Sequence, residues 1–118
     1  EVEFINMGHE PMMVLDEKFN FEYVKSTLPP SGLMPVKDES FFKTTTMDIT
    51  NKTILIYTDG VTEGYIDEGK ELEVEGLEKE IKKLNTTSPE TIINHATKIL
   101  TEKGYTLRDD ITALGIKL

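Results

Sequence analysis

A short apolar run near the middle of the chain, residues 54–57, ends abruptly at Thr58, Asp59 and Gly60. An uninterrupted run of Ile and Leu is typical of a strand that is buried on both faces. The carboxylate of Asp59 therefore falls where strand pairing stops and a ligand can be reached, and Gly60 permits a tight turn and a close approach of the backbone. Because Asp-Gly also marks ordinary hairpin turns, this run alone leaves a turn-forming role for Asp59 open.

A second acidic element, Asp109-Asp110, stands directly before the last apolar stretch, residues 111–118. That stretch predicts a closing strand. The two acids have an ordinary interpretation as loop or strand-end residues, and a functional one if they lie beside Asp59.

Composition limits the class of protein. The 118 residues are 37% hydrophobic and 30% charged, which favours one soluble globular domain over a disordered chain. No apolar run approaches the roughly 20 residues that span a bilayer, and no secretion signal begins the sequence. The net charge of −9 disfavours binding to nucleic acid and to anionic membranes. Without cysteine, disulfides and thiolate chemistry are excluded.

The pattern predicts strands first and helices later. Predicted strands are 2–6 and 11–15 as a hairpin around Gly8-His9-Glu10, then 21–25, 41–49, 53–57 and 111–118, with a polar loop at 65–70. Residues 74–84 keep helical apolar spacing, and Ser88-Pro89 is a good start for a second helix, which Gly104 is placed to end. Because two helices follow one another, we predict an antiparallel α+β fold rather than parallel βαβ units. Met12 and Met13 are expected in the core.

Three motifs in order resemble the C-terminal portion of the metal-dependent protein serine/threonine phosphatases, the PPM class, and especially its bacterial SpoIIE-like branch. They are residues 6–11 (Asn-Met-Gly-His-Glu-Pro), residues 57–60 (Tyr-Thr-Asp-Gly) and residues 109–112 (Asp-Asp-Ile-Thr). The resemblance extends over residues 1–118. It implies the C-terminal part of one phosphatase domain, that is, part of an αββα sandwich whose upstream part is absent.

The resemblance implies that Asp59 and Asp109 are metal ligands. The complete domain is then expected to hold two magnesium or manganese ions, which activate a water for attack on phosphoserine or phosphothreonine. Asp110 falls where related phosphatases often carry Asn, so an orienting role and a plain loop role are equally open. We expect the carboxylates of Asp59 and Asp109 to lie roughly 4–7 Å apart, as a shared hard-cation site requires.

Other residues receive weaker assignments. His9 is a candidate proton donor, but a structural role in its turn is favoured. Glu63 is expected to support the loop after the metal-binding strand, and His95 to be packed or solvent-facing on its helix.

Two departures from the family pattern qualify the function. The upstream Asp that normally bridges both metals has no counterpart before Asn6, and residues 31–36 differ from the usual segment there. The chain begins in mid-pattern at Glu1, which suggests a piece of a longer protein. We therefore expect a phosphatase in the complete protein and weak metal binding and activity in this piece. The alternative is a catalytically incomplete regulatory or binding module, and a third is an unrelated acidic domain.

The resemblance also suggests the setting. The expected partner is a phosphorylated bacterial regulatory protein, for example an antagonist of an anti-sigma factor, in the cytoplasm or beneath a membrane to which other domains attach the protein. Uncovered apolar surface further predicts a homodimer or larger assembly of the isolated piece.

Overall fold

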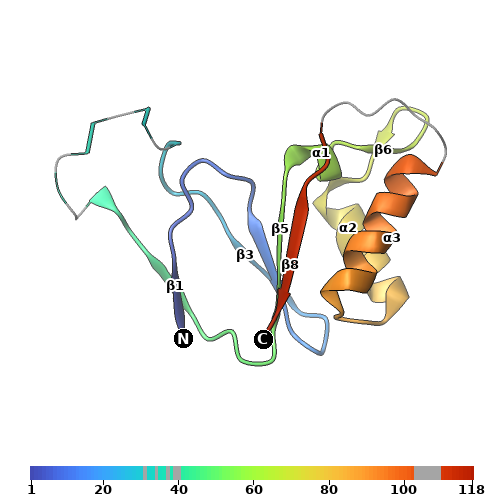
Figure 1. Ribbon diagram of the computed structural model, residues 1–118, viewed down its shortest axis with the longest axis horizontal. Coiled ribbons are helices and arrows are strands. Elements are labelled where there is room, and N and C mark those ends of the chain that lie inside the picture. The colour runs from blue at the N-terminus through green and yellow to red at the C-terminus, as the bar shows by residue number, and fades with distance from the viewer. Residues whose placement is uncertain (31, 34, 37, 39–40, 103–109) are drawn as a thin grey trace.

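The computed structural model describes residues 1–30, 32–33, 35–36, 38, 41–102 and 110–118. At its centre is an antiparallel sheet in the order β3-β2-β5-β8, formed by β2 (Met12–Leu15), β3 (Phe21–Val24), β5 (Thr53–Tyr57) and β8 (Ala113–Lys117). The helices α2 (Glu73–Leu84) and α3 (Pro89–Thr101) lie on one side of this sheet, and β1 (Val2–Phe4) and β4 (Thr45–Met47) pair on the other side (Figure 1). The predicted α+β class, with a mainly antiparallel sheet and two consecutive helices, is confirmed.

Strand β5 is the central strand that the apolar run predicts. It pairs with β2 on one side and with β8 on the other. Leu55 and Tyr57 join the core beneath the helices, whereas Ile54 joins the core on the opposite face. Because both faces of β5 are covered, an uninterrupted apolar sequence is stable there.

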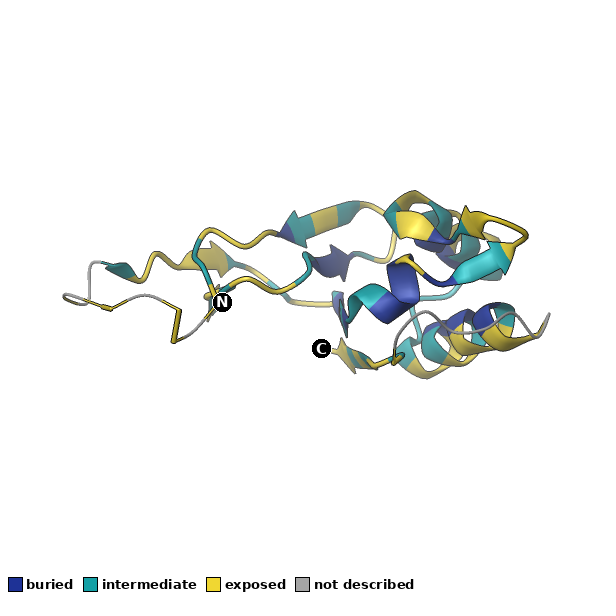
Figure 2. Cartoon of the chain, turned by 90° about the horizontal axis from the view of Figure 1, so that it is seen from above, coloured by how far each residue is buried: buried dark blue, intermediate teal, exposed yellow. Residues whose placement is uncertain are grey.

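Two hydrophobic clusters hold the sheet between its layers. Met13 and Leu15 pack toward the helices, and Met12 and Val14 pack on the opposite side, so the expected core positions of both methionines are confirmed. In Figure 2 the buried residues gather in the half of the molecule that holds the helices, whereas the other half is mostly intermediate or exposed. The helix-side cluster is therefore the principal core.

The two helices begin and end largely as their sequence signals predict. Asn85, in a left-handed conformation, ends α2, and the Ser88 hydroxyl accepts a hydrogen bond from the Thr91 N–H at the start of α3. His95 of α3 is half-buried and lies 2.8 Å from the Glu80 carboxylate of α2 through Nε2, a contact that lowers the pKa of Glu80. Of the two settings expected for His95, packed or solvent-facing, the structure shows a half-buried side chain in contact with α2. Gly104, the predicted helix end, lies outside the described residues.

Helix length also bears on membrane insertion. Within the described ranges, none of the helices has both the length and the apolar character needed to cross a bilayer.

Four predictions of local structure need correction. The predicted hairpin of 2–6 and 11–15 is wrong, because β1 pairs with β4 while β2 pairs with β3 and β5. The predicted strand 41–49 is regular only in β4. The predicted loop 65–70 contains a small hairpin of β6 (Tyr65–Asp67) and β7 (Lys70–Glu71). A short helix, α1 (Asp59–Thr62), follows β5 in place of the expected tight turn.

Candidate functional site

The end of β5 and the beginning of β8 meet at one edge of the central sheet. Beyond the last strand pair, the Thr58 N–H donates a hydrogen bond to the Thr112 carbonyl at 3.0 Å. The Thr58 hydroxyl donates to the Asp110 carbonyl at 3.3 Å and accepts from the Thr112 N–H at 3.2 Å. The backbone positions of Asp59 and Asp110 are therefore held at the same edge, although the two residues lie far apart in sequence.

Asp59 is the first residue of α1 and is half-buried. Its carbonyl accepts the Glu63 N–H at 2.8 Å, and the next three residues of α1, Gly60, Val61 and Thr62, are buried. Burial of α1 fixes the backbone at Asp59 against the core. No ion pair within the described part of the chain engages the Asp59 carboxylate.

Gly60 and Glu63 take positions that the sequence predicts only in part. Gly60 adopts no left-handed conformation, so the tight turn expected there is replaced by one turn of helix. Glu63 follows α1 with an exposed side chain, and its N–H closes that turn. Its predicted support of the loop through the side chain stays a prediction.

Of the two acids before β8, the structure describes Asp110 but not Asp109. Asp109 lies outside the described residues, so its role as a ligand and the 4–7 Å separation from Asp59 stay predictions. Asp110 is exposed, and its carbonyl accepts the Thr58 hydroxyl.

The loop that carries His9 reaches the same edge of the sheet, because β2 runs antiparallel to β5. In Figure 1 this loop, α1 and the start of β8 all lie at the upper end of the sheet. The Asn6 side chain organises the loop: its Oδ1 accepts the His9 N–H at 2.9 Å, and its Nδ2 donates to the Val24 carbonyl at 3.1 Å. Gly8 has a φ of +76°, and a side chain there would collide with Pro30.

His9 itself is exposed. Its Nδ1 lies 3.0 Å from the Glu10 carbonyl, and both residues line a hollow of about 150 Å³ together with Met12 and Ile56. These contacts are of the kind that a structural role predicts, while the proton-donor role stays untested.

Two features of the edge carry no assignment from sequence reasoning. Thr58 is part of the 57–60 motif. The sequence feature that could have identified it is a hydroxyl residue directly after a buried strand. Tyr57 is buried, and its hydroxyl has no hydrogen-bond partner within the described residues. Burial, together with the charges of Glu10 and Glu78, raises the pKa of Tyr57 to about 12.

The donor chemistry of this edge fits part of a magnesium or manganese site. Carboxylate oxygens are the ligands that hard divalent cations prefer, and backbone contacts place two acidic residues, Asp59 and Asp110, at one edge. Within the described residues, however, no group of three acidic or histidine side chains is close enough to hold an ion. The described part of the chain is therefore suited to supply some of the ligands of a metal centre, but not all of them.

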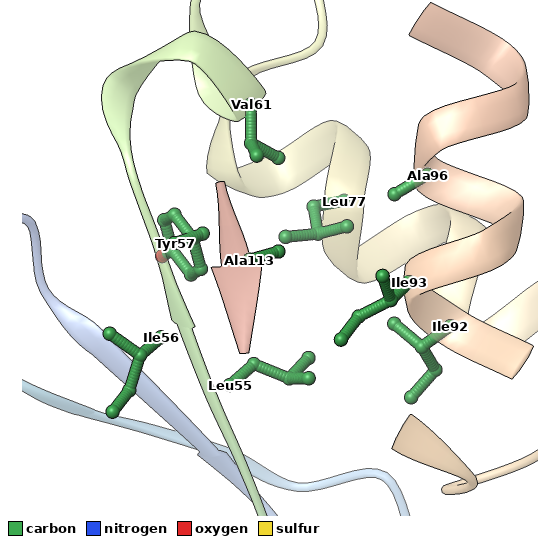
Figure 3. Close-up of a pocket in the computed structure, with 9 residues that line it drawn as sticks. All are labelled: Leu55, Ile56, Tyr57, Val61, Leu77, Ile92, Ile93, Ala96 and Ala113. Carbon is green, nitrogen blue, oxygen red and sulfur yellow. The ribbon is translucent and has the colours of Figure 1, made fainter. Parts of the chain in front are cut away.

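The hollow between β5 and the helices is not a substrate site. Figure 3 shows that apolar side chains line it, among them Leu55, Leu77, Ile92 and Ala96. Its volume of about 20 Å³ is the space of one water, and an apolar gap of this size stays dry. It is a packing gap in the core.

Comparison with known proteins agrees with this architecture. The family model described as Stage II sporulation protein E (SpoIIE) matches residues 1–118. No curated protein shows a significant match to the chain.

Three solved structures share the fold. The PP2C phosphatase domain of Bacillus subtilis SpoIIE with a fragment of its regulatory domain superposes with a TM-score of 0.69 at 15% identity, over 98% of this chain and 33% of that one. The RsbU and RsbW domains of a Mycobacterium tuberculosis protein give 0.69 at 21% identity, over 98% and 31%. A manganese-presoaked SpoIIE phosphatase domain from Bacillus subtilis gives 0.64 at 15% identity, over 99% and 54%. The chain thus spans between a third and about half of the structures it matches.

Proposed function

Because this chain belongs to the SpoIIE family, we propose that it supplies part of the active site of a metal-dependent protein serine/threonine phosphatase. The observation that carries the proposal is the sheet edge where Asp59 follows β5 and where Thr58 contacts Asp110, shortly before β8. A carboxylate at each of two paired strand ends is an arrangement that suits a hard divalent cation.

Each residue of the edge has a distinct proposed task. Asp59 and Asp109 would hold magnesium or manganese, and Asp110 would orient the segment beside them. The chemistry that bound magnesium or manganese would supply is an activated water and neutralisation of charge on the phosphoryl group. Gly60 lets the backbone of α1 pack without a side chain next to Asp59, and His9 keeps the neighbouring loop in shape.

The remaining ligands must come from elsewhere in the complete domain. This chain covers 54% of the matched phosphatase domain and about a third of the two longer structures. One of those structures was soaked with manganese, which supports a metal-dependent chemistry for the fold. We expect the rest of the domain to add at least one bridging carboxylate.

The proposed substrate is a bacterial regulatory protein phosphorylated on serine or threonine, such as an antagonist of an anti-sigma factor, encountered in the cytoplasm. With a net charge of −9, the chain is unsuited to nucleic acid as a partner.

A second candidate is a regulatory or protein-binding module of the same fold without catalysis. It is favoured by the lack of any cluster of three potential ligands within the described residues. The upstream sequence separates the two candidates, because an aspartate on an early strand would complete the metal centre.

The variant Asp59→Asn tests the enzyme. In the complete protein we expect manganese-dependent hydrolysis of a phosphoserine protein, or of an aryl phosphate, to fall by about two orders of magnitude or more. The amide keeps the size of the side chain but loses the charge that holds the cation, so the melting temperature should change little.

The matched control is Asp48→Asn, an exposed acid in the turn before β5, at the opposite end of that strand. Its Oδ1 accepts the Thr50 N–H, a bond that an asparagine oxygen can keep. We expect this variant to retain full activity. Undiminished turnover of Asp59→Asn at saturating manganese would exclude Asp59 as an essential ligand.

A further inference from the structure

We propose that Thr58 is a positioning residue whose hydroxyl fixes the segment entering β8 relative to Asp59, so that carboxylates from the two strand ends meet at one cation. This inference rests on the proposed function and adds a residue to which that function gives no role.

The hydroxyl makes contacts that the strand ladder does not supply. Regular pairing of β5 and β8 ends at Tyr57 and Ala113. Beyond it, the Thr58 N–H donates to the Thr112 carbonyl, and the hydroxyl both accepts from the Thr112 N–H at 3.2 Å and donates to the Asp110 carbonyl at 3.3 Å. The Thr112 carbonyl lies 3.4 Å from the same hydroxyl, a competing acceptor for its proton. Thr58 therefore extends the contact between the two strands beyond Ala113, to Thr112 and Asp110.

These contacts of the Thr58 hydroxyl matter because of where Thr58 lies in the chain. Asp59 is the next residue after Thr58 and is fixed by buried α1, but Asp110 is exposed. Ligand oxygens of a hard cation must each come within about 2.0–2.6 Å of the ion, so small displacements of one ligand weaken binding strongly. A hydrogen bond from Thr58 to the Asp110 carbonyl ties the exposed segment before β8 to the residue that precedes Asp59.

The ordinary alternative is that Thr58 is only a β-branched residue suited to a strand end. Thr58→Val separates the two interpretations, because valine keeps the branched shape and removes the hydroxyl. Thr58→Ser does the reverse, since it keeps the hydroxyl and loses the methyl group.

The experiment uses the protein that carries the whole phosphatase domain. Free manganese, measured by electron paramagnetic resonance, gives the dissociation constant of each variant. We expect Thr58→Val to raise that constant about tenfold, equivalent to about 1.4 kcal/mol, and Thr58→Ser to restore it to within about threefold. In the metal-free protein, the Thr112 amide should exchange with solvent faster in Thr58→Val, because its acceptor is gone.

Thr53→Val is the matched control. Thr53 begins the same strand, and its buried hydroxyl donates to the Thr87 carbonyl at 2.8 Å, far from the edge that carries Asp59. This variant should lower the melting temperature without changing manganese affinity.

The outcomes separate the two proposals. Wild-type protein that binds no manganese would overturn the proposed function. Wild-type protein that binds manganese, with Thr58→Val binding it equally tightly, would overturn the positioning role alone. Equal weakening by Thr53→Val and Thr58→Val would show a loss of fold stability instead, and would also overturn it.

Discussion

Tyr57 brings a polar group into the helix-side core at the point where β5 ends. Its side chain is 3% exposed, and the hydroxyl has no hydrogen-bond partner within the described residues. Tyr23, two strands away, differs, because its hydroxyl donates to the Glu78 carboxylate of α2. Leaving a buried hydroxyl unpaired costs on the order of 1–3 kcal/mol, so the two tyrosines should respond oppositely to its removal.

We predict that Tyr57→Phe raises the free energy of unfolding of the domain by about 1 kcal/mol, whereas Tyr23→Phe lowers it by a similar amount. Urea denaturation measures both. Burial raises the pKa of folded Tyr57 to about 12, above the unfolded value near 10, so ionisation of the unfolded tyrosine lowers the free energy of unfolding further as pH rises from 10 toward 12, and this loss is absent below pH 10. Tyr57→Phe should remove that part of the alkaline loss. A strongly destabilised Tyr57→Phe would show that the hydroxyl has a partner.

At the scale of elements, local signals predicted the structure where they were strong. The apolar run of β5 and the apolar spacing of α2 were each sufficient to predict the element, because each element buries a continuous set of apolar side chains. The hairpin around His9 failed because pairing is not local: β1 joins β4, some 40 residues later, and the Asn6 side chain holds an open loop instead. The sequence around Gly8 indicates a turn but cannot indicate which strand lies beside β1.

The contact between β8 and α3 depends on Gly115. A side chain there would overlap with Pro89 and approach Ile93 and Leu55 at 3.2 Å. We predict that Gly115→Ala lowers the free energy of unfolding by about 1–3 kcal/mol, because a rigid proline cannot move aside. Gly76→Ala on α2 is the control, since it meets only the flexible end of Leu72 and gains helix propensity, and should raise stability by up to about 1 kcal/mol. Thermal or urea unfolding decides, and equal effects of both changes would contradict the close-packing argument.

At the scale of the whole molecule, the candidate site could be predicted in outline only. Two acidic elements at the ends of apolar runs indicate one shared edge once the runs are taken as neighbouring strands. Thr58 contacts the backbone of Asp110 at that edge, whereas Asp109, the predicted ligand, lies outside the described residues. The Thr58 contacts could not be predicted, because they depend on the register of β5 with β8. The helical turn at Gly60 was also missed, since Asp-Gly is a stronger signal for a turn than for four residues of helix.

One face of the molecule remains open. The register places Leu114 and Ile116 of β8 on the same face of the sheet as Ile56 and Ile54, opposite the helices. On this face Leu114 is 54% exposed and Ile116 is 39% exposed. β8 is also an edge strand of the central sheet. The radius of gyration, 15.6 Å, exceeds the roughly 13–14 Å of a compact domain of this length. Apolar surface beside an unpaired strand edge favours association.

We therefore predict that the isolated 118-residue chain forms a dimer or larger assembly through this face, which an upstream part of the domain would cover in the complete protein. Sedimentation should show the assembly, and Leu114→Lys with Ile116→Lys should shift it toward monomer. Leu33→Lys is the control, because Leu33 is even more exposed but lies outside the strands of the central sheet. In the same preparation, manganese should bind weakly and phosphatase activity should be low, since the described residues hold no complete ligand cluster. A monodisperse monomer that binds two ions tightly would contradict both the open face and the missing ligand.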